Sequence, residues 1–209
     1  RLTATAGMDA VTRAGEAHAS IRKNPVSDAF SAKAVELIAA NLPTACRNGA
    51  DTEARTSLAL ASLMAGAAFS NAMVGIVHAI GHSLGGLCRI PHGQAMMMLL
   101  PHCVRFNLDR GIHAGLYGQL LDALAPARAA ALGAGAAPEA LDRAFLDELT
   151  ALNDLFHREY GVPLTLSELG VSRDDLPAVA KQARYDGAAL YNETEITLED
   201  AMAVLEAAY

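Results

Sequence analysis

Apolar side chains recur along this chain at intervals of three and four residues, the spacing of one face of an α-helix. No segment alternates apolar and polar residues as a half-buried strand does. Of the 209 residues, 52% are hydrophobic but only 5% are aromatic, and a composition dominated by alanine and leucine favours helix over strand. We therefore predict an all-α fold, with residues 1–209 forming one domain of about eight to ten helices.

Caps and breaks place the individual helices. Helices are expected at about 7–20, after Pro25 with Ser27 or Asp28 as cap and an interruption at 41–43, from Asp51 or Thr52, from His92, over 139–160, and after Thr197. The segment 126–138 is rich in alanine and glycine and is expected to be a loop or a weak helix.

The stretch from Leu58 to Val77 carries no charge and is long enough to span a bilayer. It holds as much Ala, Gly, Ser and Asn as Leu, and two histidines follow it at once, so we predict a helix buried inside a soluble domain, with no membrane partner. The first 20 residues are amphipathic rather than charged and then apolar, and do not resemble a signal peptide.

Charge and cysteine content exclude further classes. The net charge of −7 argues against a nucleic-acid partner, which requires a basic face. Cys46, Cys88 and Cys103 are odd in number and lack paired spacing, which indicates reduced thiols in a cytoplasmic protein rather than a disulfide framework. The apolar composition favours self-association into a homo-oligomer.

Three histidines are the main candidates for functional residues in this chain. His78 and His82 are four residues apart, so both imidazoles lie on one face of a helix. His92 follows after a glycine-rich turn, near the start of the next helix. Because neutral imidazole is a common ligand for zinc, iron, copper and nickel, these residues predict either a metal site or an active site. A single buried histidine, by contrast, is more often a structural residue.

The motif His-Ala-x-x-His-x-x-Gly, followed by Pro-His-Gly, resembles the signature of the iron-dependent (group III) alcohol dehydrogenases. Similar segments extend over essentially the whole chain, from Gly7-Met8-Asp9 to the closing stretch 186–209. The resemblance implies the helical C-terminal domain of the dehydroquinate synthase-like fold. The family's N-terminal α/β nucleotide-binding domain, with its Gly-Gly-Gly-Ser motif, has no counterpart here.

The resemblance also implies roles for single residues. Members of the family hold a divalent metal with an Asp and a His four residues apart, the first His of the paired motif and the His of Pro-His-Gly. The matching positions here are Asp9, Arg13, His78 and His92. We therefore expect Asp9, His78 and His92 to be metal ligands for iron or zinc. His82 matches the histidine beside the nicotinamide, which implies contact with the cofactor and proton transfer.

Arg13 departs from the family pattern, because a guanidinium is always protonated and cannot donate a lone pair to a cation. Three arrangements remain open. The other three ligands and water could complete the metal site, or Arg13 could turn away while another group fills the gap. Alternatively, Arg13 could pair with Asp9, four residues earlier on the helix, and place its own charge at the metal position. His18 is not expected to substitute, since it lies on the opposite helix face from Asp9.

The implied function is metal-assisted hydride transfer between a small alcohol or aldehyde and NAD(P), with the nucleotide held by the missing domain and this chain inactive alone. The alternative is a non-catalytic or metal-free helical protein derived from the same scaffold. A Gly-Gly-Gly-Ser motif encoded upstream would favour the dehydrogenase. An initiator Met just before Arg1 would favour the non-catalytic protein. A helical metal-binding bundle of other ancestry leaves the full-length resemblance unexplained.

The remaining polar and sulfur-containing candidates are expected to be structural. Met96-Met97-Met98 is predicted to pack in the core rather than bind copper. The other histidines, His102, His113 and His157, are expected to be structural or exposed. Four acidic residues are expected on a solvated helix face, namely Asp142, Asp147, Glu148 and Asp154.

Overall fold

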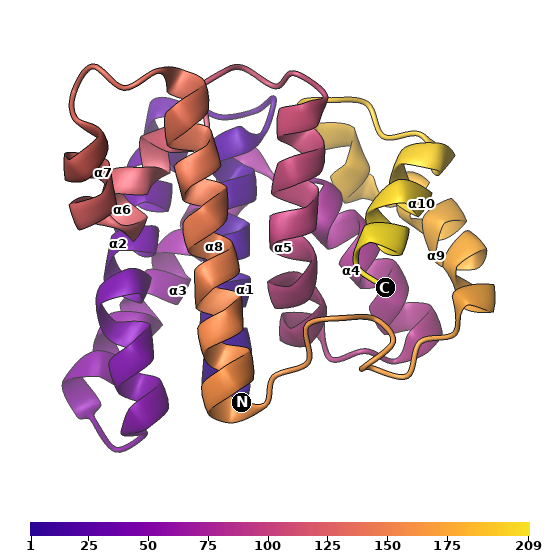
Figure 1. Cartoon of the computed structure of the whole chain (residues 1–209), viewed down its shortest axis with the longest axis horizontal. Helices are drawn as coiled ribbons and strands as arrows, with labels where there is room; N and C mark the ends of the chain where they lie inside the picture. Colours follow the sequence, from indigo (N-terminus) through magenta and orange to yellow (C-terminus); the bar gives the residue numbers. More distant parts are fainter.

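Helices form the whole architecture of the chain. The computed structural model describes all 209 residues and contains no strand, which confirms the all-α prediction (Figure 1). The α-helices are α1 Leu2–Ala19, α2 Pro25–Arg47, α3 Thr52–Ala72, α4 Ile76–Cys88, α5 His92–Asp109, α6 Leu121–Leu124, α7 Pro126–Leu132, α8 Pro138–Tyr160, α9 Leu176–Arg184 and α10 Leu198–Ala207. Short 3₁₀ turns are Gly118–Leu120, Arg173–Asp175 and Gly187–Tyr191.

The helices form two groups joined by α5. Helices α1, α2 and α3 pack on one another at one side, and α4, α9 and α10 pack together at the other (Figure 1). Helix α5 lies between them and contacts α1, α4, α8 and α10. One hydrophobic cluster runs through both groups, and Met96, Met97 and Met98 of α5 lie fully inside it, as predicted.

Helix α2 differs from the sequence prediction at its N-cap and in its interior. Its cap is Asn24, whose side chain accepts hydrogen bonds from the backbone of Val26 and Ser27, so the predicted caps Ser27 and Asp28 are wrong. The predicted interruption at 41–43 is also wrong, because the helix continues through Pro43 to Arg47. Packing against α1 and α3 stabilises this turn despite the proline.

The predicted apolar helix over 58–77 is two helices. Helix α3 ends at Ala72, Met73 adopts a left-handed φ of 69°, and α4 starts at Ile76. The two helices are bent by 105° relative to each other. No single helix is both long enough and apolar enough to span a membrane. Only α3 and α4 taken together reach that length and hydropathy, and they are sharply bent at the break between them.

Burial of α3 is also less complete than predicted. The alanines of one face are buried, but Leu60 is 44% exposed and Leu63 is 69% exposed. Small residues allow α3 to pack closely against α1 and α2, and the leucines lie on the face without a neighbour.

Asp142 contradicts the prediction of a solvated acidic face on α8. It is buried, and its two carboxylate oxygens accept hydrogen bonds from the backbone of Gly115 at 2.6 Å and Gly118 at 2.7 Å. Asp147 and Asp154 are exposed as expected. Helical periodicity could not distinguish Asp142 from the exposed acidic residues, because its burial is caused by the loop that packs on the first turns of α8.

Candidate metal centre

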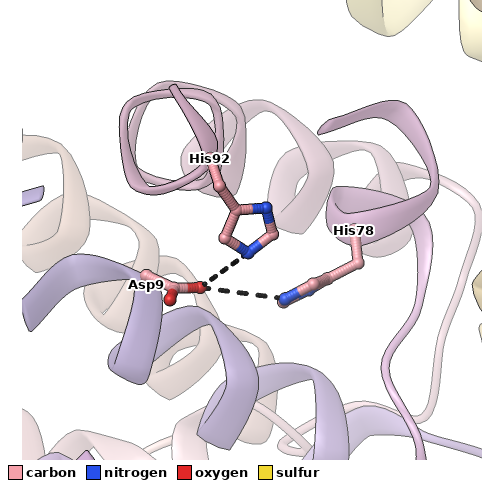
Figure 2. A group of neighbouring side chains, drawn as sticks. All are labelled: Asp9, His78 and His92. Atoms are coloured by element: carbon pink, nitrogen blue, oxygen red, sulfur yellow. Dashed lines mark ion pairs between the residues drawn. The ribbon is translucent and has the colours of Figure 1, made fainter. Parts of the chain in front are cut away.

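Three helices bring one potential ligand each to a common point. Asp9 comes from α1, His78 from α4, and His92 is the first residue of α5. Figure 2 shows the three side chains pointing toward one another. The Nε2 atom of His92 lies 3.4 Å from Asp9 Oδ1, and that of His78 lies 3.8 Å from the same oxygen. All three donor atoms lie within 4.8 Å of one another, close enough to share a cation that binds its ligands at about 2.0–2.2 Å.

The convergence depends on close contact between α1 and α5. A Cβ atom on Gly93 would lie only 2.9 Å from the carbonyl oxygen of Thr5, so a larger residue would push the two helices apart. Because His92 precedes Gly93 directly, this contact sets how closely His92 approaches Asp9.

The two oxygens of Asp9 have different surroundings. Oδ2 accepts from Arg13, whose Nη2 lies 2.6 Å away. Oδ1 is buried and has no hydrogen-bond partner. A buried carboxylate oxygen without a donor is costly, and a cation held between Asp9, His78 and His92 would remove that cost.

Glu16 was not identified from the sequence as part of the site. It lies on α1, is buried, and accepts hydrogen bonds from Nδ1 of His78 and from the backbone N–H of Val77. The sequence did carry a signal, since Glu16 is seven residues after Asp9 and therefore lies on the same face of α1.

Asp186 is a second partner that the sequence did not reveal. Its Oδ2 lies 3.1 Å from His82 Nδ1, and its other oxygen accepts from the backbone of Ala188 at 2.8 Å. The ring of His82 stacks on that of His92, with centroids 5.7 Å apart and an interplanar angle of 18°. His82 therefore lies beside the three converging residues but does not join them as a ligand.

Electrostatics at the centre favours a cation. Three carboxylates surround the three imidazoles, and Arg13 provides the one opposing guanidinium. Burial lowers the pKa of His92, the charge of Asp9 opposes this, and His78, Arg13 and His82 add to the lowering. A neutral imidazole at His92 keeps its lone pair available for a metal.

The donor set thus fits a divalent metal with three protein ligands, of which two are imidazole nitrogens and one is a carboxylate oxygen. The fourth position of the family pattern, Arg13, is turned toward Asp9 and cannot contribute a lone pair. Among the three arrangements considered above, the structure shows the Arg13–Asp9 ion pair.

The other histidines lie away from this centre. His18 contacts Gln119, and His157 Nδ1 lies 2.8 Å from the carbonyl oxygen of Val162. His113 is exposed and pairs with Glu193, while burial lowers the pKa of His102. None of these residues joins Asp9 in the candidate centre. His18 is therefore no substitute ligand, as expected, and the other three are structural or exposed, as predicted.

Comparison with known proteins identifies the fold and the family. The C-terminal model of the Fe-containing alcohol dehydrogenase family matches residues 3–209. The chain is 39% identical to the 1,3-propanediol dehydrogenase of Klebsiella pneumoniae over all of its own length and 51% of that enzyme's. It is 35% identical to the NAD-dependent methanol dehydrogenase of Bacillus methanolicus, over 98% of this chain and 51% of that enzyme.

A solved structure of an alcohol dehydrogenase shows the same helical arrangement. The alcohol dehydrogenase from Oenococcus oeni superimposes with a TM-score of 0.89 at 31% identity, covering 100% of this chain and 51% of that one. The chain spans about half the length of the curated relatives it matches. By the family match over nearly its whole length, the chain belongs to the Fe-containing alcohol dehydrogenase family and corresponds to its C-terminal domain.

Proposed function

We propose that this chain is the metal-binding half of an NAD(P)-dependent dehydrogenase that interconverts a small alcohol and its aldehyde. The relatives support the reaction class, since their names specify small alcohols and, for the Bacillus enzyme, NAD. The half-length coverage supports a partnership with an N-terminal nucleotide-binding domain. Hydride transfer requires that domain, so the 209-residue chain alone is expected to be inactive.

Asp9, His78 and His92 are the residues proposed to hold the metal. A bound divalent metal supplies Lewis-acid polarisation of the substrate oxygen and stabilises negative charge on it. The chain contributes a site with one buried carboxylate oxygen that lacks any other partner. The exposed edge of His92 leaves room for substrate beside the ligands, because its side chain is 41% exposed.

His82 is proposed to move the proton of the reacting hydroxyl. Asp186 accepts from Nδ1 of His82, so the second ring nitrogen, Nε2, is available to accept a proton. The side chain is partly exposed, which allows the proton to pass on to solvent. The stacking of its ring on that of His92 supports this role, because it keeps His82 beside the proposed metal ligands.

The observation that carries the proposal is the convergence of Asp9 Oδ1 with the Nε2 atoms of His78 and His92. The test is metal analysis and titration of the purified chain with Zn²⁺ and, without oxygen, with Fe²⁺. We expect one metal site per chain that is lost in His78→Ala and retained in the distant control His157→Ala. Failure of the unmodified protein to bind either metal would contradict the proposal.

A metal-free helical domain is the second candidate function, and the Arg13–Asp9 ion pair at 2.6 Å favours it. Here the guanidinium provides the positive charge near Asp9, and the domain acts without hydride transfer. The same titration separates the two, because only the first candidate predicts saturable metal binding. A cytoplasmic location is proposed from the three unpaired cysteines and is tested by cell fractionation.

A further inference from the structure

The carboxylate of Glu16 joins two helices that contribute to the candidate centre. Its side chain is 5% exposed, and it lies on the same helix as Asp9. Oε1 accepts a hydrogen bond of 2.6 Å from the backbone N–H of Val77, and Oε2 is bonded to Nδ1 of His78. No lysine or arginine side chain forms an ion pair with Glu16, and its side-chain partner is the imidazole of His78.

Helix α4 depends on this carboxylate at its start. The residue before the helix, Gly75, provides no side-chain cap, so its first N–H groups need partners from elsewhere. Glu16 provides one, and Asn192 Oδ1 lies 3.4 Å from the N–H of Ile76. A Cβ on Gly75 would lie 2.8 Å from Asn192 Oδ1 and 3.3 Å from Glu16 Oε1, so the glycine is what allows both groups to approach.

We propose that Glu16 is a positioning residue of the metal centre, which fixes His78 in the tautomer that can bind a metal through Nε2. An ionised carboxylate only accepts hydrogen bonds, so the nitrogen that it contacts must carry a proton. With that proton on Nδ1, neutral His78 has its lone pair on Nε2, the atom that lies 3.8 Å from Asp9 Oδ1. The inference rests on the proposed function, since it assigns a ligand atom of the same site.

The same contact couples metal binding to helix packing. Asp9 and Glu16 are held on one face of α1, and the bonds from Glu16 to Val77 and His78 place the first turn of α4 against that face. A partner that holds a ligating imidazole in one orientation removes the entropy cost of ordering it when the metal binds.

Glu16→Gln is the informative substitution because it keeps the size of the side chain. The amide oxygen can still accept from Val77, which turns the amide NH₂ toward Nδ1 of His78. His78 must then accept at Nδ1 and carry its proton on Nε2, where it blocks the lone pair from the metal. The helix cap is retained while the tautomer is reversed.

The first measurement needs no metal. Long-range ¹H–¹⁵N correlation spectra of the metal-free chain at neutral pH report which ring nitrogen of His78 is protonated. We expect the proton on Nδ1 in the unmodified protein and on Nε2 in Glu16→Gln. A proton on Nε2 in the unmodified protein would overturn the inference, even if the variant failed to fold.

The second measurement is metal titration by calorimetry. Loss of such an outer partner typically weakens metal binding by about 10- to 100-fold, and we expect at least that for Glu16→Gln. Asp142→Asn is the matched control, because Asp142 is also a buried carboxylate bonded to two backbone N–H groups but lies outside the centre. It should reduce stability and leave metal affinity unchanged.

The outcomes separate the inference from the proposed function. Equal affinity of Glu16→Gln and the unmodified protein would refute the role of Glu16. An equal loss in Asp142→Asn would show a general effect of stability and would refute it as well. If the unmodified protein binds no metal, the proposed function fails, and the tautomer of His78 still decides whether Glu16 positions it.

Discussion

Replacing Arg13 by histidine tests how one fixed charge controls the metal centre. Arg13 holds Asp9 Oδ2 at 2.6 Å, while the proposed metal would lie on the side of Oδ1. The substitution removes a permanent positive charge and restores an imidazole at the position where the family pattern has a ligand. We expect Arg13→His to bind divalent metal more tightly than the unmodified chain.

The size of the effect follows from Coulomb's law. A divalent ion and a unit charge about 5 Å apart repel by about 7 kcal/mol at an effective dielectric constant of about 20, and by about 2 kcal/mol in bulk water. The Arg13 side chain is 28% exposed and can move toward solvent, so the lower figure applies. Removal of the charge should therefore tighten binding by about 30-fold, and the new ligand adds to this.

Arg13→Gln separates the two contributions, because it removes the charge without adding a ligand. The assay is competition calorimetry against a chelator of known affinity, with Zn²⁺ in air and Fe²⁺ under anaerobic conditions. We expect metal affinity to be lowest in the unmodified chain, higher in Arg13→Gln and highest in Arg13→His. If neither variant binds metal more tightly, the charge argument and the assignment of position 13 to the centre are both wrong.

Three further predictions concern the fold. Gly93→Ala should lower the free energy of unfolding by about 1–3 kcal/mol in urea titrations, because its Cβ would press on the Thr5 carbonyl. Gly66→Ala is the control: no atom lies near its Cβ, and it should raise the free energy of unfolding by about 0.5–1 kcal/mol. Asp142→Asn should cost about 1–3 kcal/mol in the same titration, through the weakened hydrogen bonds to the loop before α6; an unchanged midpoint would contradict this. Burial lowers the pKa of His18 in the folded state, so the unfolded chain takes up the proton first and the free energy of unfolding should decline as pH falls below about 6.5. In His18→Gln the free energy of unfolding should depend less on pH between about pH 7 and 5.

The local pattern of residues was enough to predict the fold class of this protein and the helix face that carries two of its histidines. Helical spacing alone predicts the all-α fold, and the four-residue interval between His78 and His82 places both on one helix face. Spacing by itself did not bring Asp9, His78 and His92 together. That expectation came from resemblance to the family, and the structure places the three donor atoms within 4.8 Å of one another.

Only the tertiary structure decided which neighbours these residues have. Glu16 contacts His78 across 62 positions, and Asp186 contacts His82 across 104, distances over which periodicity carries no information. The break between α3 and α4 and the burial of Asp142 likewise depend on helices that pack from elsewhere in the chain. Helix formation depends on nearby residues, whereas the orientation of a buried side chain depends on whichever group the fold places opposite it.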